Sequence, residues 1–128
     1  MQDSRNSRRR FWAPLAAAVT VGCFLAGCAS PLRKGDELAA KGEWSQAVLQ
    51  FRQASVEYPD NIEVRSRLQQ TELKAAEYYY QRGVLARAKG DLDGAIGQFQ
   101  QGLVAMPDHE KLLRALREAQ TRREAHAL

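Results

Sequence analysis

The sequence predicts an all-α fold of helical hairpins joined by one extended helix. Two stretches of the chain, 34–60 and 82–108, repeat each other at an offset of 48 residues. Within each stretch, apolar residues recur at the three- and four-residue spacing of a helix face. Residues 61–89 contain no proline and a single glycine, so we expect one uninterrupted connecting helix there.

The two repeated stretches share the small and aromatic residues that shape a helical hairpin. Gly42 and Gly90 stand where a first helix must end, and glycine adopts the left-handed C-cap conformation at little cost. Small alanines allow the paired helices to approach closely, and we expect the phenylalanines to fill the space between units. The matched positions are Gly35 and Gly83, Gly42 and Gly90, Ala47 and Ala95, Phe51 and Phe99, and Pro59-Asp60 and Pro107-Asp108.

Proline and aspartate mark the boundaries between the predicted helices. We expect Pro59 and Pro107 to end the second helix of each hairpin, because proline cannot continue a helix. Asp60 and Asp108 are then predicted to cap the helices that follow, and Asp91 to cap the second helix of the second hairpin.

The connecting helix is predicted to run from about Ile62 to Lys89. After Pro107 the chain repeats the opening of this helix, which predicts a further helix over 109–128. That helix is either a cap over the last hairpin or the truncated start of a third unit. The predicted inner stripe of the connecting helix consists of Val64, Leu68, Thr71 or Glu72, Ala75 and Tyr79.

This order of residues resembles the tetratricopeptide repeat, which places glycine, a turn glycine, alanine, a large aromatic residue and proline at these relative spacings. The resemblance implies a repeat domain over 28–128, with units near 28–61 and 76–109 and a capping or truncated helix at 109–128. Units of that family recur every ~34 residues. The additional 14 residues in this chain equal about four helical turns, so they lengthen the connecting helix with little rotation of its apolar face.

Residues 1–27 have the layout of a signal peptide, with an arginine-rich start followed by 17 uncharged residues. The end of this segment resembles a lipobox, formed by Leu25, Ala26, Gly27 and Cys28. In bacterial lipoproteins the resemblance implies a diacylglycerol on the Cys28 thiol, cleavage before this residue and acylation of the new amine. An uncleaved membrane helix is the alternative, but the uncharged run is at the short end for spanning a bilayer.

The residue after the predicted lipidation site bears on the destination of the protein. In well-studied Gram-negative bacteria, aspartate at the position of Ala29 retains lipoproteins in the inner membrane. We therefore expect an anchor in the outer membrane, facing the periplasm, with the inner membrane as the alternative. The general secretory route is favoured, although Arg8-Arg9 also resembles a twin-arginine signal.

The distribution of charge argues against nucleic acid as a partner. Four arginines and one aspartate precede Cys28, so the remaining chain carries 15 basic and 14 acidic residues. A nucleic-acid-binding domain needs a basic face on its folded part. The excess positive charge of this chain instead lies in the segment that is predicted to be removed.

No group of residues in the sequence predicts catalysis, a metal site or a cofactor site. Nucleophilic or acid–base chemistry needs a positioned His, Cys or carboxylate pair. His109 follows Pro107-Asp108 at a predicted helix start, and His126 lies near the end of the chain. We therefore expect a protein that is not an enzyme, has no cofactor and takes no small-molecule substrate.

Candidate partner-binding residues lie on the connecting helix. Tyr80 falls on the face that is concave in the tetratricopeptide family, together with Glu77, Val84 and Arg87. Tyrosine and arginine are the residues that most often anchor protein partners, although an ordinary amphipathic surface produces the same pattern. The corresponding face of the first unit is predicted to be small and shallow, and comprises Leu32, Asp36, Ala39 and Ala40.

The functional hypothesis is a membrane-anchored scaffold or assembly factor in secretion, pilus or envelope machinery. It would bind protein partners through the helical-repeat groove and the membrane through its lipid. One alternative is that the chain is the N-terminal part of a longer envelope protein, such as a secretin-type channel or a peptidoglycan-associated enzyme. Both hypotheses come from the resemblance and not from a catalytic site.

The lipobox gives a direct prediction. Changing Cys28→Ser removes the thiol that receives the lipid, so the leader stays uncleaved and the protein lacks acyl chains. Gel mobility and metabolic labelling with palmitate measure both effects. Normal processing of this variant would contradict the lipoprotein hypothesis.

Overall fold

The computed structural model describes residues 30–128, and this part of the chain is entirely helical, as the sequence predicts. The predicted signal peptide, 1–27, and the predicted lipidation site Cys28 lie outside the described residues. None of the helices in this part is long and apolar enough to cross a membrane. The five helices are α1 (Pro31–Ala40), α2 (Trp44–Glu57), α3 (Ile62–Ala88), α4 (Leu92–Ala105) and α5 (Glu110–Ala127).

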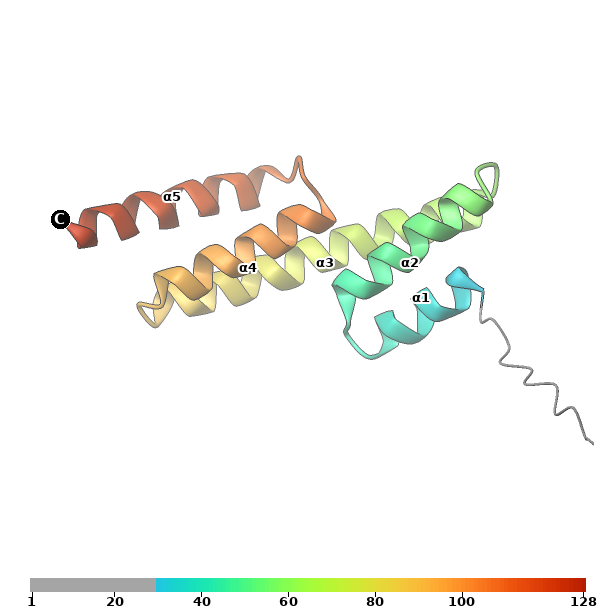
Figure 1. Ribbon diagram of the computed structural model, residues 1–128, viewed down its shortest axis with the longest axis horizontal. Coiled ribbons are helices and arrows are strands. Elements are labelled where there is room, and N and C mark those ends of the chain that lie inside the picture. Colours follow the sequence, from blue (N-terminus) through green and yellow to red (C-terminus); the bar gives the residue numbers. More distant parts are fainter. Residues whose placement is uncertain (1–29) are drawn as a thin grey trace, which may run out of the picture.

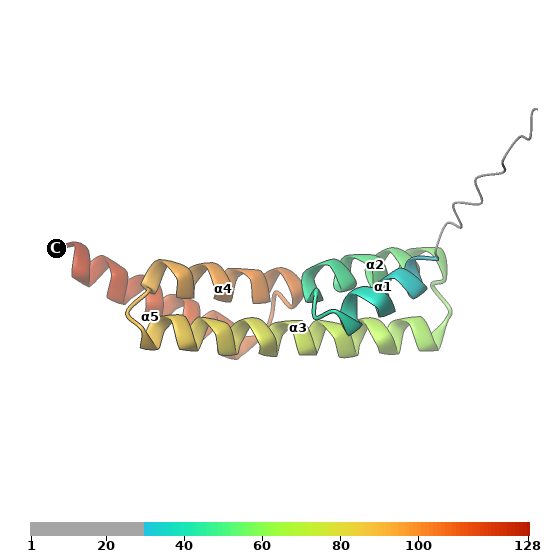
Figure 2. The same cartoon turned by 90° about the horizontal axis from the view of Figure 1, so that it is seen from below.

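The long helix α3 organises the other four (Figures 1 and 2). Helix α2 packs on its first half, and α4 packs on its second half, so that α2 and α4 lie end to end along it (Figure 2). Helix α1 packs against α2 and α5 against α4, on opposite sides of the molecule (Figure 1). The prediction of a single connecting helix from about Ile62 to Lys89 is confirmed to within one residue.

The two hairpin turns have the backbone conformation that the sequence predicts. Gly42 and Gly90 follow α1 and α3 with φ angles of 74° and 81°, in the left-handed region that favours glycine. Asp91 then caps α4, because its carboxylate accepts a hydrogen bond from the backbone N–H of Gly94 at 2.8 Å. The matching residue before α2, Glu43, makes no such bond.

The predicted caps of α3 and α5 are wrong. Asn61, not Asp60, caps α3 by accepting from the N–H groups of Glu63 and Val64. His109, not Asp108, caps α5. The reason is that each proline–aspartate pair lies within a tight turn, which moves the first helical residue one position further along the chain.

The same aromatic contact holds each hairpin together. Phe51 and Phe99 are 1% and 0% exposed, and each ring lies against a glycine of the preceding helix. A Cβ atom on Gly35 would lie 3.0 Å from the Phe51 ring, and one on Gly83 would lie 2.3 Å from the Phe99 ring. The phenylalanines therefore fill space within each hairpin, in addition to the space next to the following helix.

Polar side chains join the two hairpins at the middle of α3. The Arg52 guanidinium donates to the carbonyl oxygens of Val104 at 3.2 Å and Ala105 at 2.7 Å, and to the Glu72 carboxylate at 2.9 Å. Arg52 therefore satisfies carbonyl groups at the C-terminal end of α4, which have no partner within their own helix.

The glycine–phenylalanine contact predicts a stability difference between two substitutions. Gly83→Ala places a methyl group in the Phe99 ring, whereas Gly97→Ala adds one where no atom lies within 4 Å. Overpacking costs about 1–3 kcal/mol, and replacing helical glycine by alanine gains about 1 kcal/mol. We expect Gly83→Ala to lower the free energy of unfolding by up to ~2 kcal/mol and Gly97→Ala to raise it by up to ~1 kcal/mol.

Chemical denaturation of both variants, followed by circular dichroism, measures these differences. A Gly83→Ala protein as stable as the Gly97→Ala protein would show that the Phe99 ring is not closely packed.

Candidate functional site

The candidate site is a groove between the second half of α3 and α5. Helix α5 reaches this place because Leu112, Ala115 and Ala119 form its buried stripe and join the same apolar cluster as Ala76 and Phe99. The side chains next to that stripe stay at the surface and face α3. The groove is thus built by packing of one face of α5, which leaves the neighbouring face free for contacts.

The structure brings three of the four predicted binding residues together. Tyr80, Val84 and Arg87 line one hollow of about 360 Å³ on α3. Glu77 does not line this hollow, and its exposed carboxylate accepts a hydrogen bond from the Gln81 amide at 3.0 Å. We therefore define the α3–α5 groove from Tyr80, Val84 and Arg87 and the side chains of α5 that face them.

A second hollow of about 170 Å³ continues from the first. Tyr80 and Arg87 line both of them, and Lys111, Arg114 and Glu118 of α5 complete the second. Sequence analysis missed these α5 residues. A signal was present, because positions 111, 114 and 118 recur at helical spacing beside the apolar stripe.

Tyr80 forms a fixed aromatic wall of the groove. Its ring centroid lies 6.1 Å from that of Phe99, with the two planes tilted by 38°. The side chain is half-buried, so one part packs on the core while the other part faces the groove. An aromatic ring held in this way offers apolar contact area without losing much side-chain entropy on binding.

Arg87 and Glu118 form an ion pair across the groove. The guanidinium nitrogen and the carboxylate oxygen are 2.9 Å apart, and the two side chains are 22% and 61% exposed. Exposed pairs of this kind stabilise a protein by about 0–1 kcal/mol. A partner that supplies its own carboxylate can therefore replace Glu118 at little cost.

The groove of the first unit is larger than the sequence predicts. An open hollow of about 460 Å³ lies there between α1, α2 and α3, so the expectation of a small surface is wrong. Of the predicted residues, Leu32 packs into the core instead, and the other three line the hollow. Helices α2 and α3 supply the remaining walls, which the pattern of α1 alone does not reveal. The lining residues are Asp36, Ala39, Ala40, Trp44, Phe51, Arg67, Gln70, Thr71 and Lys74.

The main cation of this first groove is already neutralised. Arg67 donates to the Asp36 carboxylate and, at 2.7 Å, to that of Glu63. These hydrogen bonds, that to Asp36 first, raise the pKa of Arg67 above its ordinary value. The α1–α3 groove is therefore a weaker candidate for recognising a charged partner.

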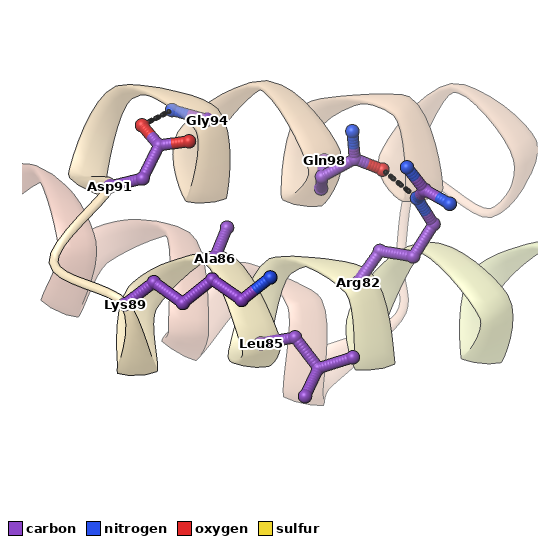
Figure 3. A pocket seen from close by; sticks show the side chains of 7 residues that line it. All are labelled: Arg82, Leu85, Ala86, Lys89, Asp91, Gly94 and Gln98. Atoms are coloured by element: carbon purple, nitrogen blue, oxygen red, sulfur yellow. Dashed lines mark hydrogen bonds between the residues drawn. The ribbon is translucent and has the colours of Figure 1, made fainter.

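A further hollow of about 320 Å³ lies at the turn between α3 and α4 (Figure 3). Three of its polar side chains, those of Arg82, Asp91 and Gln98, have structural partners in the protein. Arg82 donates to the Gln98 amide oxygen at 3.3 Å and lies over the Tyr78 ring, while Asp91 caps α4. We therefore interpret this hollow as part of the structure of the α3–α4 hairpin and not as a binding site.

Among residues 30–128, no cluster of His, Cys, Asp or Glu has the composition of a metal site. A scan against protein-family models, a search of curated proteins and a search of solved structures each find no match to the chain.

The ion pair across the groove gives a prediction on stability. In a double-mutant cycle of Arg87→Ala and Glu118→Ala, we expect a coupling energy below ~1 kcal/mol, because both side chains reach solvent. Thermal or chemical unfolding of the wild type, both single variants and the double variant measures it. A coupling energy of several kcal/mol would mean that the pair is a structural link that a partner cannot open.

Proposed function

We propose that this protein is a lipid-anchored, non-enzymatic scaffold of the bacterial cell envelope that binds protein partners through the α3–α5 groove. The observation that carries the proposal is the continuous surface formed by Tyr80, Val84 and Arg87 with the facing side chains of α5. Tyrosine and arginine are among the residues that most often anchor a partner, and the aliphatic side chain of Val84 extends the apolar wall beside them.

The helical architecture supports a tetratricopeptide-like repeat. Each hairpin has a glycine with positive φ at its turn, and each has a phenylalanine packed on a glycine of the preceding helix. These residues match at the 48-residue offset of the sequence repeat. Grooves between stacked helices are the binding surfaces of such repeats, and the α3–α5 groove is one of these.

The leader supports a membrane anchor at Cys28. Leu25, Ala26 and Gly27 precede this cysteine in the order of a lipobox. The lipid-bearing residue would lie two positions before Ser30, whose hydroxyl caps α1. Two or three acyl chains hold a protein firmly at a membrane, and we propose the periplasmic side of the outer membrane as its place.

The shape and charge of the groove favour a polypeptide over other ligands. The hollows lie side by side along α3 and α5, so they suit an extended or helical segment better than a small molecule. The near balance of 15 basic and 14 acidic residues from Cys28 onward does not suit nucleic acid. Secretion, pilus and envelope-assembly machinery are the proposed contexts.

Affinity capture from solubilised envelopes tests this function. We compare the tagged full chain with the variant Tyr80→Ala/Arg87→Ala, which truncates two side chains that line the groove. Proteins that co-purify with the wild type should be recovered several-fold less with this variant, because hot-spot side chains contribute most of the binding energy.

The matched control is Leu49→Ala/Arg65→Ala, which removes one exposed apolar and one exposed basic side chain elsewhere on α2 and α3. Thermal unfolding of both variants shows whether loss of the Tyr80–Phe99 contact changes the fold. Equal recovery of partners by a folded groove variant and the wild type would overturn the proposal.

A further inference from the structure

Positive charge gathers along the α3–α5 groove. Arg87 and two cations of α5, Lys111 and Arg114, line the hollow beside Tyr80. Arg114 also lines the next hollow, of about 270 Å³, together with Arg117, Leu113 and Glu110. Along these two hollows, four cations face two carboxylates, Glu110 and Glu118.

This excess is local and does not reflect the composition of the domain. From Cys28 onward the chain has only one more basic than acidic residue, whereas this short surface has an excess of two. Glu118, moreover, is paired with Arg87. Within residues 30–128, no carboxylate forms an ion pair with Lys111, Arg114 or Arg117, and all three are exposed.

An apolar surface adjoins these cations. Tyr80 and Val84 continue into Leu85, which is 61% exposed, and all three line the hollow that also contains Arg87. A ligand that follows the groove from α3 to α5 therefore meets an apolar wall first and unpaired cations next. The complementary ligand has an apolar group beside several negative charges.

We propose that the α3–α5 groove takes an acidic polypeptide segment in which an apolar side chain adjoins a run of carboxylates. The apolar side chain lies on Tyr80, Val84 and Leu85, and the carboxylates pair with Lys111 and Arg114 in the groove and reach Arg117 on the adjoining face of α5. This inference rests on the proposed function and specifies the chemistry of the partner at the same groove.

An anionic membrane surface would also attract these cations, but the geometry favours a polypeptide. Lys111 and Arg114 share a groove with an aromatic wall between two helices, and a planar bilayer contacts only the rim of such a groove. Helix α5 and the second half of α3 also lie towards the end of the long axis where the chain terminates, while α1 begins at the opposite end (Figure 1).

The experiment measures binding of a labelled peptide to the full lipidated chain in phosphatidylcholine nanodiscs. The probe is a short fluorescein-labelled peptide in which glutamates follow two leucines, and the control peptide has glutamines in place of the glutamates. We expect anisotropy to report binding of the glutamate peptide only, with an affinity that falls as salt is raised.

Charge reversal locates the site on the protein. Lys111→Glu/Arg114→Glu should weaken binding of the glutamate peptide by about tenfold or more, because two favourable contacts become repulsive. Lys41→Glu/Arg65→Glu makes the same change in net charge at exposed positions outside this groove, and should leave binding within about twofold. If the first variant loses helical signal, Lys111→Gln/Arg114→Gln replaces it.

Equal binding of the two peptides, or unchanged binding by a folded groove variant, would overturn the inference. Co-flotation of the wild-type nanodiscs with phosphatidylglycerol vesicles, without preference for the glutamate peptide, would assign the cations to lipid and also overturn it. The envelope capture separates this failure from that of the proposed function. If envelope partners still depend on Tyr80 and Arg87 while the protein shows no preference for the glutamate peptide, the scaffold function stands. Only the acidic ligand is then ruled out.

Discussion

The continuity of α3 is the constraint on which the rest of the structure depends. A two-helix hairpin buries one stripe of each helix and needs a third helix to cover its remaining apolar face. Here a single helix of 27 residues, about 40 Å long, covers the first hairpin with its first half and forms the second hairpin with α4 through its second half. The cluster at its middle contains Val48 of α2, Ala75 of α3 and Ala105 of α4, all nearly inaccessible to solvent. A break in α3 would therefore separate two otherwise similar halves.

Because α2 and α4 both pack on α3, α4 ends beside α2, and the polar groups at this junction need partners. The C-terminal carbonyl groups of α4 carry the negative end of the helix dipole, and Arg52 meets them with a positive charge. Glu72 of α3 balances that charge. Ser45 and Tyr79 add a second link between α2 and α3, with their oxygens 2.7 Å apart. The junction is thus held by directional polar contacts as well as by apolar packing.

Local pattern was sufficient for most of the fold but not for the site. The turn glycines and the phenylalanines follow from residue type and spacing, and so does the length of α3. The caps at Asn61 and His109 were missed because a turn of one additional residue cannot be distinguished from the sequence. Arg52 was missed because its partners at the end of α4 are 52 and 53 residues away along the chain. The α5 wall of the groove depends on how α5 crosses α3, which is a property of the packing.

The packing of α5 also explains how one helix stabilises the fold and offers a binding surface. Its apolar stripe is used against α3 and α4, and Lys111 and Arg114 on the adjoining stripe make no ion pair within the described residues. Charges on the second stripe can therefore change without exposing the core. On the proposed anchor at Cys28, only Ala29 separates the lipid from the helix-capping Ser30. The distance between the membrane and the groove is then set by the rigid helix α3 and not by a flexible linker. A partner must therefore bind at the position along the molecule where α3 places the groove.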